Sequence, residues 1–378
     1  MKIGIMTFWW AEDNYGQLLQ CYALQKYLND NGHYAYLIRY DPRNDYNKTH
    51  LIKKTLKALN PKLLLIYIKY LIINKISKYE KVKYNRFFST FRDKYIVQSP
   101  IIYYSYKELN ENPPDADIYI VGSDQVWNFN SISINKVINL INAYFLNFGN
   151  DKIKRMSYAA SWGVRNINNN LKIEVNKYLN KFDYISVREQ SGVEICKSCG
   201  FVADWVPDPT LLLSPNIYRN IYYNENIQIK PKRKYLLLYL LNNKINYSIN
   251  KIKMWAISKK LDIIYVTGND KVDKEEKVYP TIPNWLYLID NAEYIITNSY
   301  HGCIFSILFN KKFAALKLQD TFEEMNTRFD SLWELFNVSP RFLENDNFEI
   351  LENDLIKIDR QKIDKIIEKF LAVLENNN

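Results

Sequence analysis

The chain has 378 residues, of which 47% are hydrophobic and 15% aromatic, and its formal net charge is +10. This length is sufficient for two domains of ordinary size, each with its own core. The basic charge is compatible with nucleic acid, an anionic membrane surface or phosphorylated substrates, and by itself it excludes none of these partners.

We expect neither secretion nor membrane insertion. Lys2 is followed at once by a strand-like run, without the long apolar core and cleavage site of a signal peptide. No uninterrupted apolar stretch reaches the length that spans a bilayer. The expected location is therefore the cytoplasm, either in free solution or at the inner face of the membrane.

Four cysteines do not suggest a secreted disulfide framework. Cys196 and Cys199 form a single C-x-x-C, a spacing that also occurs in zinc sites and redox pairs. No second C-x-x-C and no Cys/His pair stands nearby. We therefore favour a helix end closed by Gly200.

The chain begins with a βαβ unit. Residues 2–8 suit a buried parallel strand, residues 18–28 repeat apolar side chains at helical spacing, and residues 34–40 form the next strand. The first turn lacks G-x-G-x-x-G, so it does not predict a dinucleotide site. Asn14 and Gly16 either present backbone N–H groups to an anion, or Asn14 only caps the helix.

Residues 48–94 form a basic segment with interleaved apolar residues, and Pro61 divides its helical pattern in two. A basic amphipathic helix can lie on an anionic membrane. The more ordinary interpretation is the solvated face of helices that pack their other side on a core. We favour this second interpretation and keep the first as an alternative.

Four further strands each end in polar residues. The strands are residues 117–121, 156–160, 184–187 and 201–206, and they are followed by Gly122-Ser123-Asp124-Gln125, Ser161-Trp162-Gly163, Arg188-Glu189-Gln190-Ser191 and Pro207-Asp208-Pro209. We expect these exits to gather small and polar groups at one sheet edge. Arg188 suits a bound carboxylate or phosphate. The alternative is an ion pair with Glu189 or Asp208.

Residues 211–234 are the expected connector to a second series of elements. The series consists of strands at 234–241, 262–266, 294–296 and 312–318, helices at 247–260, 284–291 and 303–309, and a terminal helix at 356–374. We therefore predict an α/β protein of two Rossmann-like, doubly wound domains that face each other across a cleft. The first covers residues 1–213, with the basic helical insertion at about 48–94, and the second covers residues 214–378, with the terminal helix.

His301 stands where a buried strand gives way to a helix. Thr297, Asn298 and Ser299 end the strand, and His301-Gly302 opens the helical run. This setting places the imidazole at the carboxyl edge of a sheet, where ligands bind and where helix N-termini attract anions. Histidine exchanges protons readily near neutral pH. The alternative is a histidine that only satisfies hydrogen bonds at the start of the helix.

Five stretches match a known pattern in order and spacing. They are Asn14-Tyr15-Gly16-Gln17, Val121 to Asn128, Ser186-Val187-Arg188-Glu189 with Ser191-Gly192, Pro207-Asp208-Pro209-Thr210, and Thr297 to Gly302. Together they resemble the polysaccharide pyruvyl transferase family. The resemblance implies a two-domain, glycosyltransferase-B-like fold.

The resemblance also implies a reaction, in which the enolpyruvyl group of phosphoenolpyruvate moves to two hydroxyls of a sugar, forming a cyclic ketal and releasing phosphate. His301 matches the family's catalytic histidine and is the candidate general acid, and Arg188 matches an arginine that would hold phosphoenolpyruvate. Neither a metal nor a cofactor other than this co-substrate is implied. The remaining candidate substrate-binding residues are Asn14, Gly16, Gln17, Gly122, Ser123, Asp124, Gln125, Asn128, Glu189, Asp208, Asn298 and Ser299.

One position departs from the family pattern. Better-characterised members carry an arginine two residues before the histidine, and this chain has Ser299 there. A serine supplies no charge. Either another cation takes its place, with Lys152, Arg155 and Arg328 as candidates, or the donor differs.

The first hypothesis is therefore a pyruvyl transferase of cell-surface polysaccharide assembly, with a sugar or lipid-linked oligosaccharide as acceptor. The basic segment would then contact the membrane surface. The alternative is a nucleotide-sugar-dependent glycosyltransferase of the same fold, because polar strand exits serve diphosphates equally well. A nucleic-acid-binding protein ranks last, since no recognition module is visible, and we expect no nucleic acid partner.

Overall fold

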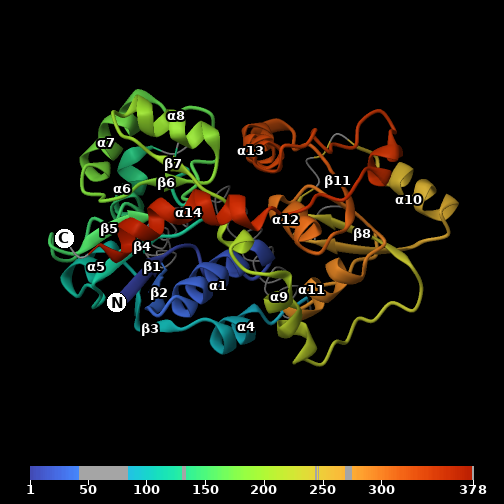
Figure 1. Cartoon of the computed structure of the whole chain (residues 1–378), viewed down its shortest axis with the longest axis horizontal. Helices are drawn as coiled ribbons and strands as arrows, with labels where there is room; N and C mark the ends of the chain where they lie inside the picture. Colours follow the sequence, from blue (N-terminus) through green and yellow to red (C-terminus); the bar gives the residue numbers. More distant parts are fainter. Residues whose placement is uncertain (42–83, 130–132, 243–244, 246, 269–274, 377–378) are drawn as a thin grey trace, which may run out of the picture.

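The computed structural model describes residues 1–41, 84–129, 133–242, 245, 247–268 and 275–376. This part of the chain forms two main parallel β-sheets with their helices, side by side in Figure 1. We call the half with the first sheet the amino-terminal half and the other the carboxy-terminal half. The α/β class with parallel sheets that we predicted is confirmed.

The first sheet has five parallel strands in the order β3-β2-β1-β4-β5. They are β1 (Lys2–Met6), β2 (Tyr34–Tyr40), β3 (Gln98–Tyr103), β4 (Ile118–Val121) and β5 (Lys154–Ser157). A short parallel pair, β6 (Ser186–Val187) and β7 (Asp204–Trp205), continues it beside β5. The helices of this half are α1 (Tyr15–Asp30), α4 (Phe88–Tyr95), α5 (Tyr106–Glu111), α6 (Ile134–Tyr144), α7 (Asn169–Leu179) and α8 (Gln190–Ser198).

The second sheet has four parallel strands in the order β11-β10-β8-β9. They are β8 (Tyr235–Leu240), β9 (Asp262–Thr267), β10 (Tyr294–Thr297) and β11 (Lys312–Ala315). The helices of this half are α9 (Pro215–Tyr223), α10 (Ile249–Ser258), α11 (Ile282–Asn291), α12 (Tyr300–Leu308) and α13 (Thr327–Phe336). β4, β8 and β10 are buried along their whole length, as their continuous apolar sequences require in a sheet covered on both faces.

The terminal helix α14 (Arg360–Glu375) packs on the first sheet. Ile367, Phe370 and Leu374 share a core cluster with Ile3 of β1. Figure 1 shows the helix crossing back, so that both chain ends lie on the side of the first sheet. The carboxy-terminal part of α14 therefore completes the core of the first sheet, whereas Ile363 near its start belongs to the core cluster shared with the second half. The assignment of the helix to the second domain stays a prediction.

Other predictions have mixed outcomes. Residues 211–234, which we expected to be a connector, contain the helix α9. Pro215 starts this helix, at a position where the N–H group that proline lacks would have no partner within the helix. Of the basic segment, residues 48–83 lie outside the described residues, and Arg92 and Lys94 belong to α4. The boundary between residues 213 and 214 stays a prediction. In the described ranges, no helix combines the length and apolar character that crossing a membrane demands.

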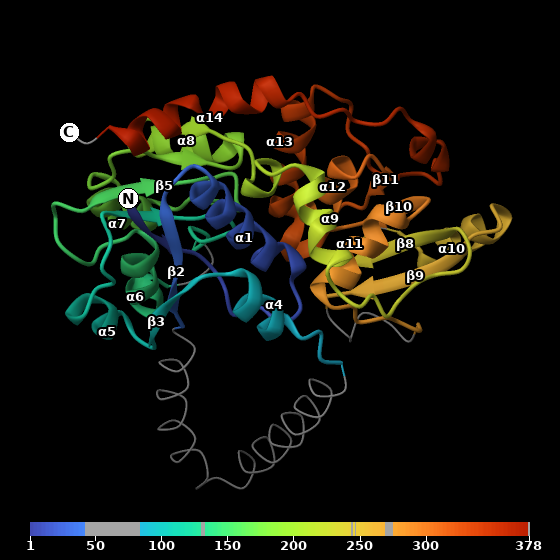
Figure 2. The same ribbon diagram turned by 60° about the horizontal axis from the view of Figure 1, so that its bottom comes forward.

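Aromatic and apolar contacts join the two halves beside α1. Tyr15 stacks on Trp285 of α11 with ring centroids 4.9 Å apart, and its hydroxyl donates to the carbonyl oxygen of Pro280 at 2.7 Å. Leu18 belongs to the same core cluster as Trp285 and Phe305 of α12. Figure 2 shows α1 between the first sheet and the helices of the carboxy-terminal half.

Polar contacts join the halves beside α13. Arg165 pairs with Asp330 at 3.3 Å, with both side chains largely exposed. The backbone N–H of Gln190 donates to the Ser331 hydroxyl at 3.1 Å. The two junctions therefore differ in chemistry: one is a shared apolar core and the other is a set of polar surface contacts.

Candidate functional site

The strand orders place the ends of four strands at two topological switch points. In the first sheet the order reverses between β1 and β4, and in the second it reverses between β8 and β10. Open parallel sheets bind ligands beyond the carboxyl ends of such strands. Ser123 and Asp124 follow β4, and His301 follows β10, so both switch points carry polar side chains.

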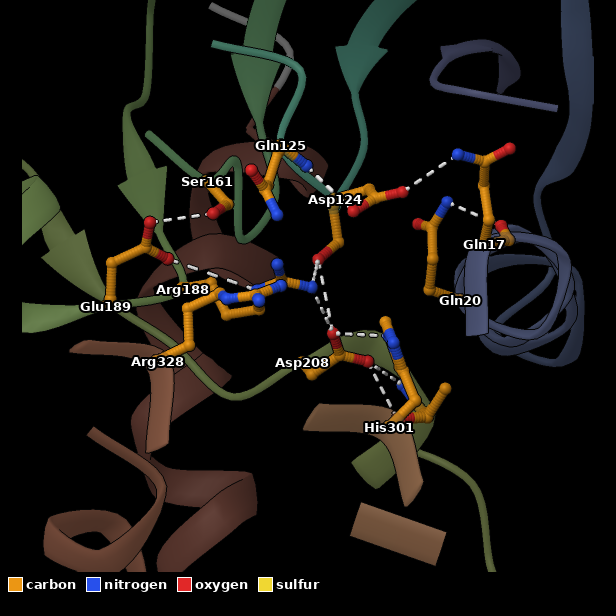
Figure 3. A network of polar contacts seen from close by, with 12 residues as sticks. Gln17, Gln20, Asp124, Gln125, Ser161, Arg188, Glu189, Asp208, His301 and Arg328 are labelled. Atoms are coloured by element: carbon orange, nitrogen blue, oxygen red, sulfur yellow. Dashed lines mark hydrogen bonds and ion pairs between the residues drawn. The ribbon is translucent and has the colours of Figure 1, made fainter. Parts of the chain in front are cut away.

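One carboxylate connects the two halves at this place. Arg188 Nη1 donates to Asp208 Oδ2 at 2.9 Å, and His301 Nε2 lies 3.3 Å from the same oxygen (Figure 3). Ser123 Oγ lies 3.2 Å from Arg188 Nη1 and 3.3 Å from Asp208 Oδ2. All four side chains are buried. The imidazole and the guanidinium that we expected to share one site therefore meet through Asp208.

The surroundings of Asp208 keep its carboxylate ionised. Burial alone raises the pKa of Asp208, but His301, Arg188 and Thr210 together hold it well below its usual range. Thr210 donates to Oδ1 from its backbone N–H at 3.0 Å and from its hydroxyl at 2.7 Å. Every oxygen of this buried carboxylate thus has a donor, which is the arrangement that a buried charge requires.

Arg188 adopts the ion pair that we kept open as its alternative, and it also retains free donors. Burial lowers the pKa of Arg188, but Asp208, Tyr300 and Glu189 raise it above the ordinary value. Its Nε lies 3.9 Å from Glu189 Oε2. Nε and Nη2 have no hydrogen-bond acceptor among the described residues. The neighbouring Glu189 accepts from the Ser161 hydroxyl at 2.7 Å and from the Gly163 N–H at 2.9 Å.

The amino end of α1 holds His301 from the other side. A Cβ atom on Gly16 would lie 2.1 Å from His301 Nδ1, so no larger residue fits there without a shift. Gly16 therefore covers Nδ1, and Nε2 is the nitrogen that faces the other polar groups. His301 lies in the first turn of α12, one residue after the helix begins.

The residues before His301 have structural contacts. Ser299 is the N-cap of α12 and its hydroxyl accepts from the Gly302 N–H at 3.1 Å. Asn298 accepts from the Leu241 N–H at 2.7 Å and donates to the Asn242 carbonyl oxygen at 3.0 Å. These bonds tie together the loops after β8 and β10 at the switch point.

The remaining predicted residues lie around the first switch point. Asn14 caps α1, as its alternative interpretation predicted, while Gln17 donates to Asp124 Oδ2 at 3.2 Å. Asp124 has a φ of +78°, in the left-handed region. Gln125 accepts from the Asn128 side chain at 2.8 Å. Gly122 packs near Thr7, 3.2 Å from where a Cβ would stand. Their substrate-binding roles stay predictions.

Only one of the three cations that we named as replacements for an arginine at position 299 lies here. Arg328 of α13 is buried next to Arg188 (Figure 3). Arg155 donates to the carbonyl oxygens of Leu146 and Phe148, and thereby holds a loop. Lys152 is exposed in that loop. The sequence signal for Arg328 was only its charge.

Tyr300 was not among the predicted residues, although it stands beside His301 in the sequence. The guanidinium carbons of Arg188 and Arg328 lie 4.8 and 5.7 Å from the centroid of its ring. An aromatic residue next to the candidate histidine was the available signal. Tyr300 was considered in the sequence only within the stretch from Thr297 to Gly302.

Two Rossmann-like halves with polar residues at both switch points define the glycosyltransferase-B-like class, as predicted. The UDP-GlcNAc 2-epimerase of Methanocaldococcus jannaschii, solved in complex with UDP-GlcNAc and UDP, is 13% identical with a TM-score of 0.50, covering 98% of this chain and 100% of that one. The UDP-GlcNAc 2-epimerase of Neisseria meningitidis, bound to UDP-GlcNAc, is 11% identical with a TM-score of 0.50 and full coverage of both chains. These identities show a shared fold alone.

Within this class, the chain belongs to the polysaccharide pyruvyl transferase family, whose model matches residues 14–320. The match includes all five stretches on which the resemblance rested. It thus marks the chain as a transferase of a family that acts on polysaccharides. A search of curated proteins finds no match.

Proposed function

We propose that the protein transfers the enolpyruvyl group of phosphoenolpyruvate to two hydroxyls of a sugar, in a cell-surface polysaccharide or its lipid-linked precursor. The family match supports this proposal. The observation that carries it is the buried contact of His301 and Arg188 with one carboxylate, because the reaction needs an acid and a cation in a dry site.

The chemistry assigns His301 as the general acid. His301 Nε2 protonates the methylene carbon of phosphoenolpyruvate, which leaves C2 as an oxocarbenium-like electrophile. One sugar hydroxyl attacks C2 and returns a proton to the imidazole, and phosphate leaves with the C–O bond electrons. The second hydroxyl then attacks C2 and gives its proton to the departing phosphate, which closes the ketal. Asp208 Oδ2 faces this same nitrogen at 3.3 Å, so the methylene carbon must take the place of that oxygen beside Nε2 when the proton is transferred. No step in this sequence requires a metal or a further cofactor.

A nucleotide-sugar-dependent glycosyltransferase is the second candidate. Its support is the fold shared with the two epimerases, which are bound to UDP-GlcNAc. A thermal-shift comparison separates the candidates. Stabilisation by phosphoenolpyruvate and not by UDP favours pyruvyl transfer, and the reverse result favours the glycosyltransferase.

The direct test measures acceptor-dependent phosphate release from phosphoenolpyruvate. We expect His301→Asn to lower kcat/KM by about 10²–10⁴-fold, the usual contribution of a general acid. His33→Asn is the matched control, because His33 lies in the turn between α1 and β2, away from the site. Equal loss in both variants, or release that needs no acceptor, would count against the proposal.

The proposal includes peripheral contact with the inner face of the membrane through the basic residues 48–94. Its support is the composition of that segment, which carries many lysines and arginines among apolar residues. Sedimentation with vesicles of anionic lipid tests it. A chain that stays in the supernatant at low salt would remove the membrane from the proposal.

A further inference from the structure

We infer that Arg188 and Arg328 together form the binding site for the anionic oxygens of the donor, either its phosphate or its carboxylate. The identity of the donor rests on the proposed function. The site itself rests on the geometry of the two guanidinium groups, and the experiment below separates these two parts.

The two guanidinium groups come from different halves and meet at one aromatic ring. Arg188 follows β6, and Arg328 lies in the first turn of α13. Their guanidinium carbons lie 4.8 and 5.7 Å from the centroid of the Tyr300 ring. Figure 3 shows the groups next to each other, and both side chains are buried. Bulk water therefore screens their charges little.

Buried N–H donors here lack hydrogen bonds, and the unpaired oxygen Glu189 Oε2 lies 3.9 Å from Arg188 Nε, beyond hydrogen-bond distance. Arg188 Nε and Nη2 are buried and have no acceptor among the described residues. Arg328 donates from Nε to the carbonyl oxygen of Met325 at 3.1 Å, and this is its one hydrogen bond within the described ranges. Unpaired buried donors are unfavourable, and anionic oxygens would satisfy them with charge-assisted hydrogen bonds.

The two positive charges are also unequally compensated. Asp208 pairs with Arg188 at 2.9 Å, whereas Arg328 forms no ion pair with any carboxylate in the described part of the chain. Burial, and next the charge of Arg188, lower the pKa of Arg328 to about 10. The group is thus charged at neutral pH and repelled by its neighbour. An anion between them turns this repulsion into attraction.

The position of Arg328 also accounts for the serine at position 299. Ser299 is the N-cap of α12, where its hydroxyl accepts from Gly302. The charge that this turn does not supply comes instead from α13. Arg328 is accordingly a binding residue for the donor in this chain, and Arg188 is its partner from the other half.

The test measures binding of phosphoenolpyruvate, inorganic phosphate and pyruvate to the full-length protein by calorimetry. We expect Arg328→Gln to weaken binding of phosphoenolpyruvate about 10- to 100-fold, as the loss of one or two charge-assisted hydrogen bonds implies. Arg328→Lys keeps the charge but loses the planar fork, so it should bind with intermediate affinity. The anion whose affinity falls with Arg328→Gln, phosphate or pyruvate, identifies the end of the donor that Arg328 holds.

Arg341→Gln is the matched control for loss of a buried arginine. Arg341 and Arg328 are each 6% exposed, but Arg341 donates to the carbonyl oxygen of Asp354 and lies over Phe313, in the carboxy-terminal half. We expect this variant to bind all three anions as the wild type does. Phosphate should raise the melting temperature of the wild type and of Arg341→Gln, and raise that of Arg328→Gln much less.

The outcomes separate the inference from the proposed function. Unchanged affinity of a folded Arg328→Gln for all three anions overturns the inference and leaves pyruvyl transfer standing. Binding of phosphate that depends on Arg328, without binding of phosphoenolpyruvate, supports the anion site and rejects the donor. A wild type that binds none of the anions overturns both. If Arg328→Gln does not fold, equal affinity of Arg328→Lys and the wild type overturns the inference.

Discussion

Asp208 is the residue on which the charged groups of both halves depend. It accepts from Arg188 and Thr210 and faces His301, and none of its surface reaches solvent. A buried ion pair adds little net stability when intact, but removing one partner leaves the other charge buried alone. The residue therefore affects stability and activity by the same contacts.

We predict that Asp208→Asn lowers the free energy of unfolding by about 3–5 kcal/mol, the usual result of removing one partner of a buried pair. The pKa of Asp208 is depressed in the folded protein, so the ionised carboxylate stabilises the fold above its unfolded pKa of about 3.9. This contribution is lost as the pH falls below that value. In urea unfolding, the wild-type advantage over Asp208→Asn should be constant from about pH 5 to 7 and shrink below about pH 4.

Asp330→Asn is the control for this experiment. It breaks an exposed pair with Arg165, so it should lower the free energy of unfolding by less than about 1 kcal/mol. An Asp208→Asn protein that is as stable as the wild type at neutral pH would contradict the pairing.

Gly16 provides a second prediction at the scale of single residues. In Gly16→Ala the new methyl group would stand 2.1 Å from His301 Nδ1, so the imidazole or the start of α1 must shift. We expect kcat/KM to fall by about 100-fold or more, since small misplacements of a catalytic group have effects of this size. Steady-state kinetics measure the loss of activity, and circular dichroism checks that the variant is folded.

Gly122→Ala is the graded comparison for Gly16. Its new methyl group would lie 3.2 Å from the Thr7 Cβ, a contact that a slight shift relieves. We expect a much smaller loss of activity. Equal losses in both variants would argue against a specific role of the contact between Gly16 and His301.

The sequence predicted where single residues of the candidate site lie better than which side chains they contact. His301 and Arg188 were recognisable because each follows a buried strand, which places it at a sheet edge. The neighbourhood of Arg328 and Arg188 was not recognisable, since α13 and β6 are far apart in the chain and no local pattern relates them. The sequence also could not show whether Glu189 or Asp208 is the closer partner of Arg188. That choice depends on how the chain packs after β6 and after β7.

Among the elements, α14 has the most consequential position, because it belongs to one half in sequence and to the other in packing. Phe370 is fully buried, and its ring contacts those of Tyr158 and Tyr184 with centroids 4.8 and 5.9 Å apart. The helix thus covers one face of the first sheet. Its apolar spacing predicted a helix, but spacing does not say which sheet the helix covers.

We predict that Phe370→Ala destabilises the protein by about 3–5 kcal/mol, the usual cost of deleting a buried aromatic side chain. Glu368→Ala on the exposed face of α14 should change stability by no more than about 0.5 kcal/mol. Chemical denaturation of both variants measures the difference. Similar values for the two would contradict the packing of α14 on the first sheet.

Two of the elements that were not predicted from the sequence, β3 and α9, contain a proline. β3 contains Pro100, which argues against a central strand, and the strand is indeed at the edge of its sheet. α9 begins with Pro215, which suggested a connector but is favoured at the first helical position. In both cases the effect of the proline depends on where it lies within its helix or strand. The sequence did not define the bounds of these two elements, so it did not reveal that position.

At the scale of the whole molecule, the two junctions between the halves have unequal strength. Separation beside α1 would break the stack of Tyr15 on Trp285 and expose a shared core. Separation beside α13 would break surface contacts such as Arg165 with Asp330, which contribute little. Substrates need access to Arg188 and His301, which are buried in this arrangement. We therefore expect opening on the side of α13.

A cross-link in Arg165→Cys/Asp330→Cys tests this expectation. The native side chains meet at their tips, so a thiol-reactive cross-linker with a reducible linker is needed to span the two cysteines, and the four native cysteines are buried from the reagent. We expect cross-linking to stop turnover and reduction of the linker to restore it. Each single substitution is a control that should remain active after treatment with the reagent. A fully cross-linked protein with wild-type kcat would show that substrates enter by another route.

The contact between His301 and Asp208 has a consequence for water. Its two members belong to different halves, so the opening that we expect beside α13 would draw the imidazole and the carboxylate apart. In the open molecule, where solvent would reach the donor site, the imidazole and the carboxylate would be apart in the two halves. Under the proposed function, this separation would disfavour hydrolysis of the enol phosphate in the open molecule and would limit ketal formation to the closed one.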